Sequence, residues 1–91
     1  MIDKEIKKLT EYGQKQFSEP EDYTKFGLDE IEHHVPELRN LHAKKDPHLH
    51  AELADVYIWA RMLLEINSVD ERIVRQRIER FKEKINKALE E

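Results

Sequence analysis

The segment from residue 53 to residue 66 constrains the fold of this 91-residue chain more than any other. Only Asp55, Arg61 and Glu65 carry a charge in it, and apolar side chains occupy almost every other position. A helix that is apolar on nearly all sides must be covered on more than one of them. A chain of this size hides only about 60–65% of the surface that its unfolded form exposes, so its own core is thin. We therefore expect a second helical layer or a second subunit to supply the cover.

The spacing of apolar residues predicts four helices and no strand. The expected helices cover about residues 3–17, 19–44, 47–66 and 69–89. Ser18 is the expected N-cap of the second helix and Asp46 that of the third, while Pro36 should kink or restart the second. Short connections between helices are typical of a bundle. We therefore predict an all-α, four-helix bundle-like fold, with residues 1–91 in one domain that oligomerisation completes.

Composition narrows the class of protein. Charged residues make up 40% of the chain, yet the net charge is only −4, which argues against a binder of nucleic acid polymers. There is no cysteine, and therefore no disulfide framework and no thiolate zinc site. No signal-peptide pattern is present, and no apolar run approaches the ~18 residues of a membrane span. We expect a cytoplasmic protein that does not enter the membrane.

Two carboxylates fall on the apolar side of the predicted third helix. At about 100° per residue, Glu52 lies on the same side as Trp59, and Asp55 lies on its flank. Buried charges must be paired, neutralised or bound to a cation. We expect both residues to be buried and to belong to a metal site. The alternative is that both meet Lys or Arg from a neighbouring helix in structural ion pairs.

The predicted second helix carries a matching row of polar side chains. Glu30, His34 and Glu37 follow one another at spacings of four and three, so they share one helix face. His34 also lies between Ile31 and Leu38, which is compatible with an ordinary core histidine. Carboxylates at spacings of three on facing helices form divalent-metal sites in helical bundles. Oxygen ligands suit Mg²⁺ or Mn²⁺, and an imidazole favours Mn²⁺ or another transition metal.

These residues resemble a known pattern. Residues 34–38 read HVPEL and residues 52–56 read ELADV, with fourteen residues between Glu37 and Glu52. The pair is similar to the MazG-like all-α nucleotide pyrophosphohydrolases, which carry E-x-x-E on one helix and E-x-x-D on the next. The resemblance covers about residues 28–84 and is specific at ELADV.

The resemblance implies roles for individual residues. Glu37, Glu52 and Asp55 would be catalytic Mg²⁺ ligands, and His34 would take the place of the family's first glutamate as a fourth ligand. A later helix of the family brings basic and amide side chains to the phosphates. Arg77 and Lys84 match two of these positions, whereas Phe81 replaces the amide.

The resemblance also implies an activity and a partner. The reaction is hydrolysis of a nucleoside triphosphate to the monophosphate and pyrophosphate, with Glu37 as a possible acceptor of the water's proton. The active unit would be a homodimer or a dimer of dimers. His34, Pro36 and Phe81 depart from the family pattern. They leave open a non-catalytic helical module, for oligomerisation or nucleotide binding, that has lost activity.

A histidine pair suggests a weaker zinc hypothesis. His48 and His50 lie near the start of the predicted third helix. Residues two apart on a helix point about 200° apart, so these two cannot easily share one ion. Polar surface histidines are the alternative.

Overall fold

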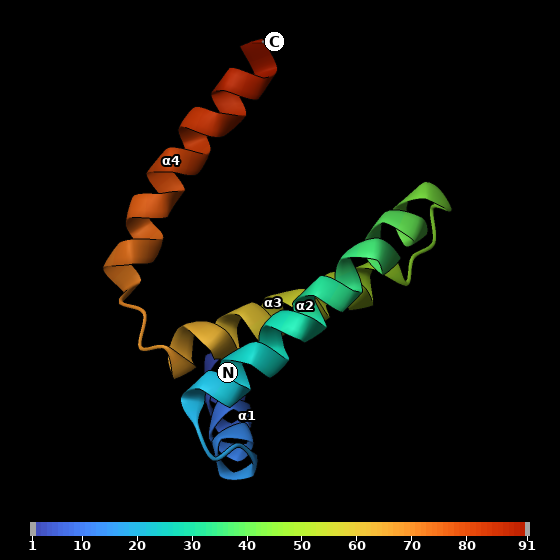
Figure 1. Cartoon of the computed structure of the whole chain (residues 1–91). Helices are drawn as coiled ribbons and strands as arrows, with labels where there is room; N and C mark the ends of the chain where they lie inside the picture. Colours follow the sequence, from blue (N-terminus) through green and yellow to red (C-terminus); the bar gives the residue numbers. More distant parts are fainter. Residues whose placement is uncertain (1, 91) are drawn as a thin grey trace.

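The computed structural model describes residues 2–90, and α-helices account for nearly all of them (Figure 1). The helices are α1 (Ile2–Gln16), α2 (Pro20–Ala43), α3 (Leu49–Ile66) and α4 (Glu71–Glu90). No strand occurs in this part of the chain, which confirms the all-α prediction. A short connection joins α2 to α3, so these two helices lie side by side as a hairpin, and α1 packs across them. Among the described helices, none is both long and apolar enough to cross a membrane.

A small core lies where α1 meets α2 and α3. Its buried apolar side chains are Ile6, Tyr23, Met62 and Ile66. The Tyr23 ring stacks on Phe17 with 4.9 Å between ring centroids and 17° between planes. Gly13 permits this close approach, because a Cβ atom there would overlap the Tyr23 ring. The thin core expected from the chain length is therefore present, and it depends on one aromatic stack.

The helix boundaries differ from the sequence prediction in two places. The N-cap of α2 is Glu19, whose extended backbone (φ −131°, ψ 143°) precedes Pro20, so Ser18 as the cap was wrong. The Glu19 carbonyl already accepts bonds from the N–H groups of Asp22 and Tyr23, which starts the helix one residue later. The α2 backbone stays helical through Pro36, so the predicted restart there does not occur. Packing of α2 along α3 offsets the one hydrogen bond that a proline removes.

Asp46 lies two residues before the N-cap of α3, which is His48 and makes no side-chain cap bond, so Asp46 as the cap was wrong. Its side chain accepts a hydrogen bond of 2.9 Å from the His48 backbone N–H. This bond holds the turn that leads into α3, which begins at Leu49.

The fourth helix stands apart from the other three. Figure 1 shows α4 extending away from them, and within residues 2–90 it contacts none of α1, α2 and α3 and buries no residue. The expected four-helix bundle is therefore not formed within one chain. In the connection after α3, the Asn67 side chain donates to Thr24 Oγ1 (3.1 Å) and the Val69 N–H donates to the Leu64 carbonyl (2.9 Å). These bonds hold the end of α3, and Ser68 between them has a positive φ of 51°.

Candidate metal-binding site

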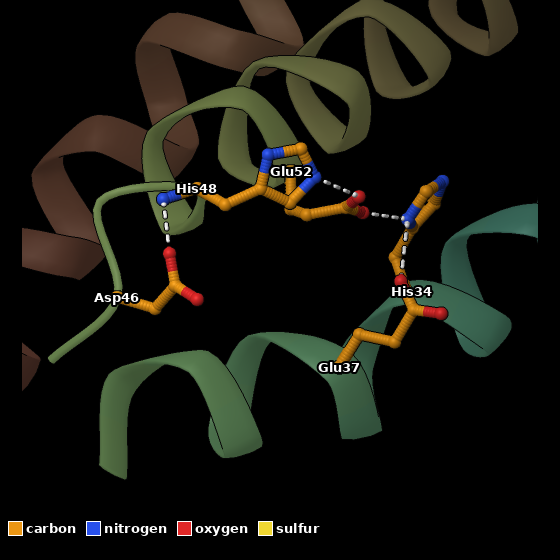
Figure 2. A network of polar contacts seen from close by, with 5 residues as sticks. All are labelled: His34, Glu37, Asp46, His48 and Glu52. Atoms are coloured by element: carbon orange, nitrogen blue, oxygen red, sulfur yellow. Dashed lines mark hydrogen bonds and ion pairs between the residues drawn. The ribbon is translucent and has the colours of Figure 1, made fainter. Parts of the chain in front are cut away.

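Packing of α2 against α3 brings His34, Glu37 and Glu52 together (Figure 2). One potential ligand atom from each lies within 4.8 Å of the other two. His34 Nδ1 is 2.5 Å from Glu52 Oε2 across the two helices and 4.0 Å from Glu37 Oε2 one turn along α2. Three of the four predicted metal ligands thus share one site. Glu30, one turn before His34, does not belong to this group.

The three side chains differ in their exposure to solvent. The His34 and Glu52 side chains are only 15% and 13% exposed, whereas that of Glu37 is 52% exposed. The site therefore has two partly buried groups between the helices and one carboxylate at its open edge. A small ligand could approach this edge without any rearrangement of α2 or α3.

Asp55 does not lie where the sequence predicted. It is exposed, not buried, and it is outside the group formed by His34, Glu37 and Glu52. The reason is that α1 packs on α3 near Met62 and Ile66, beyond the turn that carries Asp55. Asp55 instead lies with His34 in the wall of a groove of about 410 Å³, whose other walls come mostly from apolar residues of α1 and α3.

A second histidine, which the sequence reasoning missed, contacts the partly buried carboxylate of Glu52. His48 Nε2 is 3.4 Å from Glu52 Oε1, so the Glu52 carboxylate lies between the imidazoles of His34 and His48 (Figure 2). The signal was the spacing of four between His48 and Glu52, which places them on one helix face. The zinc hypothesis had paired His48 only with His50.

The alternative, that Glu52 and Asp55 pair with lysine or arginine, is not observed among the described residues. Over residues 2–90, neither Glu52 nor Asp55 forms an ion pair with a lysine or arginine. The partners of Glu52 are two imidazoles. An imidazole can pair with a carboxylate, and it can also bind a transition metal. His34 Nδ1 cannot carry a proton for Glu52 and bind a metal ion at the same time. The arrangement therefore permits either a closed His34–Glu52 pair or an N,O-ligand set for Mg²⁺, Mn²⁺ or another transition metal.

The two candidate phosphate ligands lie on α4. Arg77 and Lys84 are both exposed, and the Lys84 Nζ atom lies 5.2 Å from the centroid of the Phe81 ring. Because α4 contacts no other helix of residues 2–90, one chain does not bring these cations to His34, Glu37 and Glu52.

Comparison of the chain with protein-family models, with curated proteins and with solved structures gives no match. The likeness to the MazG-like family therefore rests on the sequence of residues 34–38 and 52–56 alone.

Proposed function

We propose that the chain is a metal-dependent nucleoside triphosphate pyrophosphohydrolase of the MazG-like kind, which releases pyrophosphate and a nucleoside monophosphate. The observation that carries the proposal is the convergence of His34, Glu37 and Glu52 from two helices. These side chains belong to the two sequence segments that carry the resemblance. Two carboxylates and an imidazole are a ligand set that Mg²⁺ or Mn²⁺ accepts.

Each residue then has a defined task. His34, Glu37 and Glu52 hold the ion, and Asp55 adds a carboxylate from the groove that it shares with His34. A divalent ion bound there would neutralise phosphate charge and lower the pKa of a bound water. Glu37, half-exposed at the edge of the site, is placed to accept a proton from that water.

Arg77 and Lys84 are proposed to hold the phosphates through charge-assisted hydrogen bonds. Within one chain α4 keeps them away from the metal ligands. The proposed active unit is therefore a homodimer or a dimer of dimers, in which α4 of one chain can serve another.

A non-catalytic helical module is the second candidate, and the short His34–Glu52 contact favours it. At 2.5 Å this pair can satisfy a partly buried carboxylate without any metal ion. In that case the cluster stabilises the packing of α2 on α3 and has no chemical role.

Pyrophosphate release from a panel of ribo- and deoxyribonucleoside triphosphates, with Mg²⁺ and with Mn²⁺, separates the two candidates. We expect metal-dependent release that falls by at least about 100-fold in Glu52→Gln and in Asp55→Asn. Glu65→Gln is the matched control, because Glu65 is an exposed carboxylate on the same helix outside the site. Far-ultraviolet circular dichroism establishes that each variant is folded.

A folded wild-type protein that releases no pyrophosphate with either metal would refute the hydrolase proposal. The structural alternative predicts a different pattern for Glu52→Gln. That change would mainly lower the free energy of unfolding, because it leaves His34 without its charged partner.

A further inference from the structure

The apolar face of α4 has no partner among the described residues, although its pattern is that of a packed helix. Val74, Ile78, Phe81 and Ile85 follow at spacings of four, three and four, and their exposures range from 38% to 58%. This spacing is the a/d seam of a helix that packs lengthwise against another surface. The seam therefore requires a partner that one chain does not supply.

The charges beside the seam identify the kind of partner. Arg75 and Lys82 border it on one side, and Arg77 and Lys84 border it on the other. Two copies of α4 packed on each other would place these cations opposite one another, in parallel and in antiparallel orientation alike. Like charges across such a seam oppose pairing. An acidic surface is therefore favoured over a second α4.

The three-helix body, residues 2–70, provides such a surface. It contains fifteen acidic and nine basic residues, a net charge of −6, whereas α4 has seven basic and four acidic residues, a net charge of +3. The groove between α1, α2 and α3 combines exposed apolar side chains, among them Leu9 and Tyr12, with the carboxylate of Asp55. An apolar helix with basic borders complements this groove in both respects.

The exposed area of the chain is large enough to require a stable partner. The chain exposes 7846 Å², whereas a compact monomer of 11.0 kDa exposes about 5,600 Å². The excess is about 2,200 Å² per chain and about 4,400 Å² for two chains, and the latter lies within the range of roughly 2,000–5,000 Å² that obligate dimers bury in total. The radius of gyration, 15.5 Å, likewise exceeds the value of about 12 Å for a compact domain of this length.

The connection between α3 and α4 favours a second chain over the chain's own groove. The Asn67 side chain bonds to Thr24 Oγ1 and to the Leu63 carbonyl, and the Val69 N–H bonds to Leu64. Asp70 then caps α4 through the Arg72 N–H at 2.8 Å. Docking on a second copy keeps this arrangement, whereas folding α4 back onto its own body requires the backbone at residues 69–70 to change direction.

We propose that two chains exchange their fourth helices, so that α4 of each docks in the α1–α2–α3 groove of the other. A reciprocal exchange of this kind closes with two-fold symmetry and leaves no seam exposed. Phe81 becomes a packing residue of the interface, which accounts for an apolar side chain at the position where the resemblance implies an amide. Arg77 and Lys84 reach the rim of the partner groove that contains Asp55 and His34, and only this consequence for substrate binding rests on the proposed function.

Oligomeric state tests the proposal without metal or nucleotide. Light scattering should give twice the chain mass for the wild type, and Phe81→Glu should weaken association by about 30-fold or more. Gln76→Glu, which adds the same charge on the opposite face of α4, should leave association unchanged. A wild-type monomer at high concentration, or equal effects of the two variants, would overturn the proposal. A monomer without helical structure in Phe81→Glu is not expected, since Phe81 is already exposed in the single chain.

Cysteine cross-linking identifies the surface that α4 covers, because the natural chain contains no cysteine. Phe81→Cys mixed with Tyr12→Cys should give a heterodimeric disulfide, and Phe81→Cys mixed with Lys25→Cys, an exposed site on α2, should not. Cross-linking of Phe81→Cys mainly to itself would show α4–α4 pairing and refute the exchange. A disulfide within a monomeric Phe81→Cys/Tyr12→Cys double variant would show fold-back, which also refutes it. Failure of either test leaves the metal-site experiment untouched.

Discussion

The helices of the three-helix body and α4 are all amphipathic, yet only α1, α2 and α3 pack against one another within residues 2–90. Tyr23, Met62 and Ile66 are buried where α1 meets α2 and α3, whereas Ile78 and Phe81 on α4 are half-exposed. The difference shows that an apolar stripe determines that a helix will be covered, but not by what. For α4, the proposed cover is inferred from the charges beside the stripe and from the exposed area of the chain.

The largest effect should come from the aromatic stack of the body. Tyr23→Ala removes a ring that is only 3% exposed and stacks on Phe17, and should lower the free energy of unfolding by about 3–5 kcal/mol. Urea denaturation followed by circular dichroism measures this change. Phe81→Ala on α4, measured at concentrations where the chain is monomeric, should change it by less than about 0.5 kcal/mol. Equal losses in the two variants would mean that the body and α4 share one core.

The two glycines of the body should respond unequally to alanine. At Gly13 an added Cβ would overlap the rigid Tyr23 ring, and we expect a loss of about 1–3 kcal/mol in the free energy of unfolding. At Gly27 the added Cβ would lie 2.7 Å from Leu63 Cδ2, the end of a flexible side chain that can turn away. The gain in helix propensity offsets much of that contact, so Gly27→Ala should be nearly neutral. Thermal melting of both variants provides the comparison, and a larger loss at Gly27 would contradict it.

A smaller effect, on the affinity for a metal ion, is expected from the removal of His48, whose imidazole contacts Glu52. His48→Ala removes the contact of 3.4 Å to Glu52 Oε1 and should weaken Mn²⁺ binding by about tenfold, as loss of a ligand's hydrogen-bond partner generally does. Isothermal titration calorimetry measures the affinity. His50→Ala is the control, because within residues 2–90 His50 forms no ion pair with the cluster. Unchanged Mn²⁺ affinity in His48→Ala would show that His48 does not position the carboxylate.

The smallest effect concerns the cap of α4 and its dependence on pH. Hydrogen bonds from the side chain and backbone N–H of Arg72 hold the pKa of Asp70 below its ordinary value. A lowered pKa means that the cap stabilises α4 fully at neutral pH and loses this effect as the pH falls through the folded-state pKa, below about 4. Nuclear magnetic resonance should detect fraying of the first turn of α4 in acid before α3 changes. Asp70→Asn should remove the acid-induced fraying of the first turn, because an asparagine cap does not titrate.

The sequence predicted the helices better than their assembly, and the candidate site shows why. Glu52 and His34 were found because each combines a polar group with a place on an apolar stripe, a pattern that periodicity reveals. Asp55 satisfied the same criterion and is nevertheless exposed, because burial on a helix flank depends on where a neighbouring helix crosses. His48 was missed because Glu52 was considered as a metal ligand or as a partner of Lys or Arg, and not as the partner of an imidazole one turn away.

Local rules were sufficient for the helical segments and for the short connection of α2 to α3, because spacing and turn residues act within a few residues of the chain. They did not identify the N-cap residues of α2 and α3. The sequence by itself therefore determined four helices, the row of His34 and Glu37, and the amphipathic face of α4. Only the tertiary structure decided that α1 leaves Asp55 exposed and that α4 points away from its own body. The first outcome depends on where α1 crosses α3, and the second on the backbone direction after Asn67, whose side chain bonds to Thr24, and neither is set by a local pattern.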